Sequence, residues 1–110
     1  EALLASMERM LARSPRQMFL THYGRVGGSV AQVQRLAALL RTQIAEMVAI
    51  ARASQGQAQR HAALKSGLEA LYLRELARHG CALPPERQRN LLAMDVELNA
   101  QGLDVWLAGR

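Results

Sequence analysis

The sequence predicts an all-α fold, a helical bundle of four to five helices built on a long central helical hairpin. Hydrophobic residues make up 50% of the 110-residue chain but aromatic residues only 4%, so the core must come from leucine, alanine, valine and methionine. These residues have high helix propensity, whereas the β-branched residues that favour sheets are sparse. Apolar residues also recur at three- and four-residue steps, as in amphipathic helices. The length predicts a single helical domain, 1–110.

The N-terminal quarter of the chain is predicted to contain two helices. The first covers residues 2–13, and its apolar face carries Leu3, Leu4, Met7, Met10 and Leu11. Ser14 then begins an S-x-x-Q capping box with proline at the first helical position. This signal predicts a short helix from Pro15 to about Tyr23, with Met18 and Phe19 facing inward and Tyr23 as a third candidate for that face. We expect the glycines that follow to end it in a loop.

The clearest predicted element runs from Val30 to about Ala53, after a second capping box that begins at Ser29. With Val33 as position a of a heptad, five of the six a and d sites are apolar: Val33, Leu36, Leu40, Met47 and Ile50. Alanine and isoleucine at the e sites widen this stripe. The width fits a core-facing bundle helix better than the seam of a two-stranded coiled coil.

The connection after this helix has two interpretations. Ser54-Gln55-Gly56-Gln57 predicts a turn, after which a helical pattern resumes to Arg78 and ends at His79-Gly80. The same heptad register, however, continues onto Leu64, Leu68 and Leu71, so one helix of about 50 residues is the alternative. Because glycine costs about 1 kcal/mol inside a helix, Gly56 favours the hairpin.

The last predicted helix begins after a proline pair. Leu83-Pro84-Pro85-Glu86 predicts an extended connection and then a helix from Pro85 to about Gln101. We expect Gly102 to break or kink this helix. The residues that follow, Leu103 to Leu107 with Trp106 among them, form an apolar tail that is predicted to dock onto another surface.

The charge of the chain is unevenly distributed. Eight arginines and a single acid, Glu46, stand between Arg9 and Arg60, a net charge of +7. Residues 61–110 hold six cations and six acids. A localised positive surplus indicates an acidic partner, which is a phosphate, a lipid or a protein.

The sequence predicts no catalytic residue, no metal and no cofactor, and therefore no enzyme. His79 and Cys81 are close, but the paired ligand spacing of a zinc site is missing. The same two residues lack a third group that would orient a nucleophile and its base. The glycine-rich run 24–29 before a helix is similar to a phosphate-binding loop, but no strand is predicted before it and its lysine is missing. We interpret that run as a flexible connector.

Membrane insertion and secretion are not indicated. No apolar run approaches the roughly 20 residues of a membrane span, and no secretory signal is present, so we predict a cytoplasmic protein. Aromatic residues are too few for a helix lying on a membrane surface. Arginine exceeds lysine 13 to 1, a bacterial-like composition that GC-rich coding explains. Since the sequence begins at Glu1, we expect a fragment or a trimmed product of a longer chain.

The function predicted from these features is a non-enzymatic helical protein–protein interaction module that self-associates as a homodimer. An adaptor, a secretion-chaperone-like protein and an assembly subunit fit equally. Leu39 and Val48 lie off the main apolar stripe of the long helix, and Leu103 and Trp106 belong to the apolar tail. Arg41 and Arg52 are eleven residues apart and share a helix face, from which they would steer an acidic protein partner. The predicted partner-binding residues are Leu39, Val48, Leu103, Trp106, Arg41 and Arg52.

The alternative function is nucleic-acid binding through the basic first half. Segment 19–40 can be interpreted as a helix–turn–helix, with a glycine turn before a capped helix. Residues 27–32 followed by Arg35-Leu36 are similar to the turn of factor-for-inversion-type DNA-binding domains. This resemblance implies DNA binding through Arg25, Arg35 and Arg41.

Overall fold

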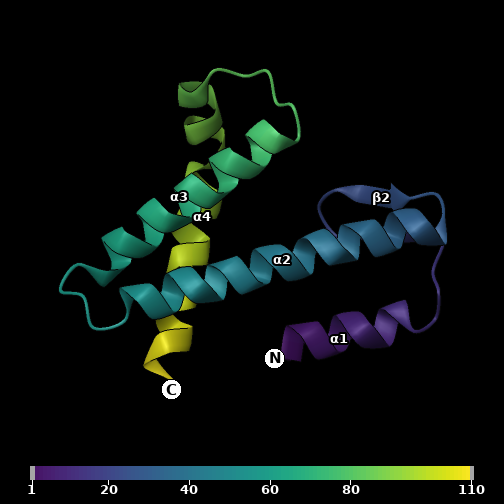
Figure 1. The fold of residues 1–110 in the computed structure, drawn as a ribbon, viewed down its shortest axis with the longest axis horizontal. Helices are drawn as coiled ribbons and strands as arrows, with labels where there is room; N and C mark the ends of the chain where they lie inside the picture. The colour runs from purple at the N-terminus through teal and green to yellow at the C-terminus, as the bar shows by residue number, and fades with distance from the viewer. Residues whose placement is uncertain (1, 110) are drawn as a thin grey trace. The chain divides into compact units, whose positions relative to one another are not determined.

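The computed structural model describes residues 2–109, which are 72% helical, with four helices and one small sheet. The elements are α1 (Ala2–Leu11), β1 (Gln17–Leu20), β2 (Gly24–Gly27), α2 (Val30–Ser54), α3 (Arg60–Arg78) and α4 (Pro85–Ala108) (Figure 1). The prediction of a mostly helical chain is confirmed. The chain divides into two compact units, Glu1–Ala45 and Glu46–Arg110, and α2 contributes residues to both.

The long helix begins and ends close to where the sequence predicts. The Ser29 hydroxyl accepts a hydrogen bond from the Gln32 backbone N–H at 3.2 Å, which caps the N-terminus of α2. The helix ends at Ser54, and Gly56 lies in the following turn with φ of +82°. Since α3 begins only at Arg60, the alternative of one long helix is wrong.

Residues 17–27 form a β-hairpin, so the predicted helix from Pro15 to Tyr23 is wrong. β1 and β2 pair antiparallel, with Met18 opposite Val26 and Phe19 opposite Arg25. Ser14 does not cap a helix but follows α1 with φ of +48°. The helix–turn–helix interpretation of segment 19–40 fails because its first helix is this hairpin. The connector expected at residues 24–29 is mostly strand β2.

The first unit packs the hairpin and α1 around the first half of α2. Met7, Val33 and Ala37 are its buried apolar residues. Apolar side chains from α1, β1 and α2 also enclose a cavity of about 120 Å³: Met7, Met10, Leu11, Met18, Leu20, Val33, Leu36, Ala37 and Leu40. Met18 and Leu20, two residues apart on β1, both line it, as expected for one face of a strand. Phe19 is exposed between them, and Tyr23 is exposed in the turn, so the prediction that these two residues face inward is wrong.

The second unit is built from the end of α2, α3 and α4, and α3 packs along α4. Its core consists of Ala51, Leu64, Leu68, Val96, Ala100 and Leu107. Gly67 lies against α2, where a Cβ atom would stand 2.6 Å from Cγ2 of Ile50. The two helices therefore approach too closely at this point for any side chain larger than hydrogen.

The ends of α3 and α4 are set by specific backbone bonds. Gly80 has φ of +79°, its N–H donates to the Ala77 carbonyl at 3.1 Å, and the Cys81 N–H donates to the Leu76 carbonyl at 2.9 Å. This is a Schellman motif, which confirms the predicted role of Gly80. α4 continues through Gly102 to Ala108, so the apolar tail is part of that helix and does not follow a break.

Candidate functional site

The predicted partner-binding residues of the first unit have different surroundings. Leu39 is exposed on α2, with 44% of its surface accessible. Arg41 forms an ion pair across to α1, with its Nε and Nη2 at 2.9 Å and 2.5 Å from Oε1 of Glu8. Arg25 and Arg35 are exposed on β2 and α2. Of the three arginines predicted to contact nucleic acid, two therefore form no ion pair within the described residues.

The predicted residues of the second unit are mostly used in its own packing. Leu103 and Trp106 lie against the apolar core, and Val48 is half-buried. Arg52 is exposed in the last turn of α2. Leu103 and Trp106 thus stabilise the second unit and leave little apolar surface for a partner.

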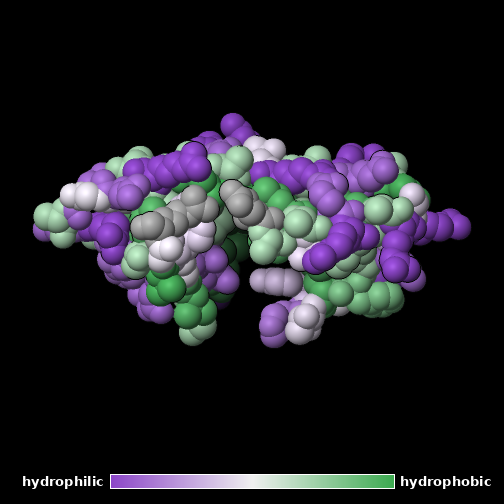
Figure 2. Space-filling view, turned by 90° about the horizontal axis from the view of Figure 1, so that it is seen from below, coloured by the Kyte–Doolittle hydropathy of each residue, from purple (hydrophilic) through white to green (hydrophobic). Residues whose placement is uncertain are grey.

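The described chain nevertheless exposes a large amount of apolar surface, and hydrophobic residues are visible between hydrophilic ones on the face in Figure 2. In the second unit this surface follows one line along α4. Leu91, Met94, Leu98 and Val105 are 55%, 73%, 59% and 74% exposed. We call these four residues the α4 stripe. The sequence alone does not reveal this stripe, because Leu91, Met94 and Leu98 cannot be told apart from the neighbouring core residue Leu92 until the packing of α4 is known.

The α4 stripe faces away from the core of its own unit. Its residues are spaced by three, four and seven positions, which keeps them on one side of a helix. The side that packs on α3 and α2 carries Leu92, Val96, Ala100, Leu103 and Leu107. At 100° per residue the two sets lie on nearly opposite sides of the helix. α4 is therefore apolar on two faces, only one of which the unit covers.

Two charged residues beside the α4 stripe form no ion pair within the described part of the unit. Arg87 and Asp95 lie on the same side of α4 as the stripe, and neither forms an ion pair within residues 2–109. Most other charges of this unit are paired: Arg60 with Asp104, Lys65 with Glu97, Arg74 with Glu46, Arg78 with Glu75, and Arg89 with Glu69. One cation and one acid thus remain available at the edge of the stripe.

In the first unit, by contrast, most of the described charged residues form no ion pair. Residues 9–45 contain six arginines and no acid. Arg41 forms an ion pair with Glu8. The other five arginines form no ion pair in the described chain: Arg9, Arg13, Arg16, Arg25 and Arg35. The positive surplus predicted from sequence therefore stays uncompensated on this unit, where it can attract an anionic partner.

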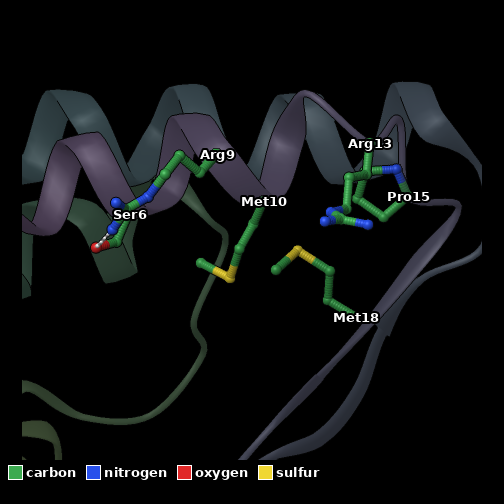
Figure 3. A pocket seen from close by; sticks show the side chains of 6 residues that line it. All are labelled: Ser6, Arg9, Met10, Arg13, Pro15 and Met18. Carbon is green, nitrogen blue, oxygen red and sulfur yellow. Dashed lines mark hydrogen bonds between the residues drawn. The ribbon is translucent and has the colours of Figure 1, made fainter.

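A hollow of about 430 Å³ lies beside α1 in this unit (Figure 3). Met10 and Met18 point toward one another across it, and Pro15 also lines it. Arg9, which donates a hydrogen bond to the Ser6 hydroxyl at 3.2 Å, and Arg13 contribute the polar part of the lining. Ser6 also lines the hollow, and the described lining contains no acid, histidine or cysteine that could activate its hydroxyl.

Glu97 is the most connected charged group of the second unit. Lys65 Nζ lies 2.7 Å from its carboxylate, Gln101 Nε2 donates at 2.8 Å, and His61 Nε2 lies at 3.0 Å. The hydrogen bond from Lys65, followed by that from Gln101, lowers the pKa of Glu97 from 4.5 to about 2. These contacts tie α3 to α4, so the cluster has a structural role.

We expect this cluster to make the second unit sensitive to acid. A carboxylate whose pKa is lower when folded stabilises the fold fully above about pH 4.5 and loses that effect as the pH falls through about 2. The thermal midpoint of the Glu97→Gln variant should lie below that of the natural chain at neutral pH, and the gap should close toward pH 2. A gap that does not change with pH would contradict this role. Lys65→Met should reduce the same pH dependence.

The described residues offer no other site for chemistry. Among residues 2–109, no three histidine, cysteine or acidic side chains are grouped so that they could hold a metal ion. His61 is engaged with Glu97, and Cys81 is a half-buried free thiol next to the C-terminus of α3. Within the same residues, no helix combines the length and apolar character that crossing a membrane requires.

Comparison with known proteins gives no relative for this chain. No protein-family model, no curated protein and no solved structure matches it.

Proposed function

We propose that this chain is a non-enzymatic helical interaction module that self-associates, a bundle built on the α2–α3 hairpin. The observation that carries the proposal is the α4 stripe, whose four large apolar residues are all more than half exposed. An exposed apolar line of this kind is typical of a protein–protein contact. The role is that of an adaptor, a secretion-chaperone-like protein or an assembly subunit.

The shape of the α4 stripe supports a second copy as its partner. Positions 91, 94, 98 and 105 correspond to a, d, a and a sites of one heptad register, the narrow seam of paired helices. Arg87 occupies a d site at the N-terminal end of this seam and Asp95 an e site beside it, and the two have opposite charges. Since each copy offers both, two copies can pair these charges across the seam. Homodimers with twofold symmetry are also the commonest soluble assemblies.

Light scattering after size exclusion tests self-association. We expect a dimer at both about 0.1 M and about 1 M salt, where the Debye length falls from about 10 Å to about 3 Å, because burial of the stripe is not screened. A monomer at every protein concentration and at both salts would contradict the proposal. A dimer only at low salt would contradict the role given to the apolar stripe.

Nucleic-acid binding is the second candidate function, and the five unpaired arginines of the first unit favour it. Arginine is suited to phosphate groups because its planar fork donates two hydrogen bonds at once. Arg25 and Arg35 are the predicted contacts that remain uncommitted. Such binding should be strong at low salt and fall steeply as salt displaces the phosphate contacts.

A further inference from the structure

The outer face of the β1–β2 hairpin carries two aromatic rings that the fold does not cover. Phe19 is 73% exposed and Tyr23 80% exposed. The chain contains only four aromatic residues in total. Met18 and Leu20 take the inner face, so Phe19 is directed outward by the alternation of the strand. Tyr23 lies in the turn that joins the two strands.

Arg25 lies opposite Phe19 in the hairpin register. Side chains of residues opposite each other on one face of an antiparallel pair are neighbours, with Cβ atoms about 5 Å apart. The hairpin therefore presents an aromatic ring next to a guanidinium group, with the Tyr23 ring beyond them at the turn.

The positive charge around the hairpin indicates which class of ligand its outer face can bind. No acid occurs in residues 9–45, and Arg25 has no ion-pair partner in the described chain. The ligand should be anionic and should also offer flat surfaces to two aromatic rings. Unpaired bases on a phosphate backbone combine these properties, because each base stacks on an aromatic ring and each phosphate accepts from arginine. A duplex hides the faces of its bases within the stack.

We infer that the outer face of the β1–β2 hairpin is a stacking platform for single-stranded nucleic acid. Phe19 and Tyr23 stack on bases, and Arg25 contacts phosphates. The inference rests on the second candidate function and specifies its substrate class. It is independent of the α4 stripe, which belongs to the other unit.

The test measures fluorescence anisotropy of a labelled oligothymidylate and of a duplex of equal length. The natural chain should bind the single strand more tightly than the duplex. Phe19→Ala and Tyr23→Ala should each weaken binding of the single strand by roughly five- to a hundredfold. Leu3→Ala, which removes a 60% exposed apolar side chain from α1 of the same unit, is the matched control and should change nothing. Arg25→Ala should reduce the slope of log affinity against log salt by about 0.7.

Other outcomes would contradict either the stacking platform alone or nucleic-acid binding as a whole. Equal affinity for both probes with no effect of Phe19→Ala overturns the stacking platform but leaves nucleic-acid binding in place. No binding of either probe at low salt overturns both. Binding to phosphatidylserine-containing vesicles and not to the oligonucleotide overturns both in favour of a membrane surface. Circular dichroism of each variant checks that the fold is kept, as expected for residues so exposed.

Discussion

Replacing Leu98 with glutamate is expected to convert the self-associated protein into a monomer. Leu98 is the central residue of the α4 stripe and is 59% exposed in the single chain. Burying one leucine side chain contributes about 2 kcal/mol to the free energy of association, and a symmetric dimer buries two copies of Leu98. The loss of about 4 kcal/mol weakens association by about a thousandfold. Two buried glutamates would add the cost of desolvating charge.

The matched control for this variant is Leu39→Glu. Leu39 is also an exposed leucine on a helix, and it was one of the contact residues predicted from sequence. We expect Leu39→Glu to leave the dimer intact, as measured by light scattering at several protein concentrations. If Leu39→Glu dissociates the dimer and Leu98→Glu does not, the contact surface lies in the first unit and the α4 stripe is not the seam.

Gly67→Ala is expected to destabilise the second unit, although alanine is the better helix former. In an open helix the change would stabilise by about 1 kcal/mol. At this position the new Cβ would stand 2.6 Å from Cγ2 of Ile50, whose branched side chain has little freedom to move. Overpacking of this kind costs about 1–3 kcal/mol, so the net free energy of unfolding should fall. Trp106, the single tryptophan, packs on this core and reports its unfolding by fluorescence in urea.

Two further variants separate crowding from other effects of Gly67→Ala. Gly102 also lies inside a helix, but nothing is within 4 Å of a Cβ placed there, so Gly102→Ala should stabilise by up to about 1 kcal/mol. Ile50→Ala removes the atom that Gly67→Ala would meet. In the Ile50→Ala background, Gly67→Ala should therefore be neutral or stabilising, a coupling that a double-mutant cycle measures. Additive effects of the two changes would contradict the crowding explanation.

The helices of this chain could be predicted because their signals are local. α2 has a serine cap and a long apolar period, α3 ends at a glycine in position for a Schellman motif, and α4 begins after a proline pair. Each of these features acts within a few residues of chain. Their boundaries therefore follow from the order of the amino acids alone, to within two residues at most ends.

The hairpin could not be predicted in the same way. Ser14-Pro15-Arg16-Gln17 satisfies the local rule for a helix start, and strands of four residues are too short to show a clear alternation. What stabilises the strands is pairing between residues up to ten positions apart and packing of Met18 and Leu20 beside α1 and α2. These contacts override a weak local preference.

The sequence by itself determined the helical character of the chain, most ends of its long helices and the concentration of positive charge in the first half. Only the tertiary structure decided which apolar face of α4 is buried and which arginines stay unpaired. A helix with two apolar faces carries the same periodicity on both, and the packing of α3 selects one of them. Likewise, Arg41 and Arg25 are equivalent in sequence until α1 brings Glu8 to one of them.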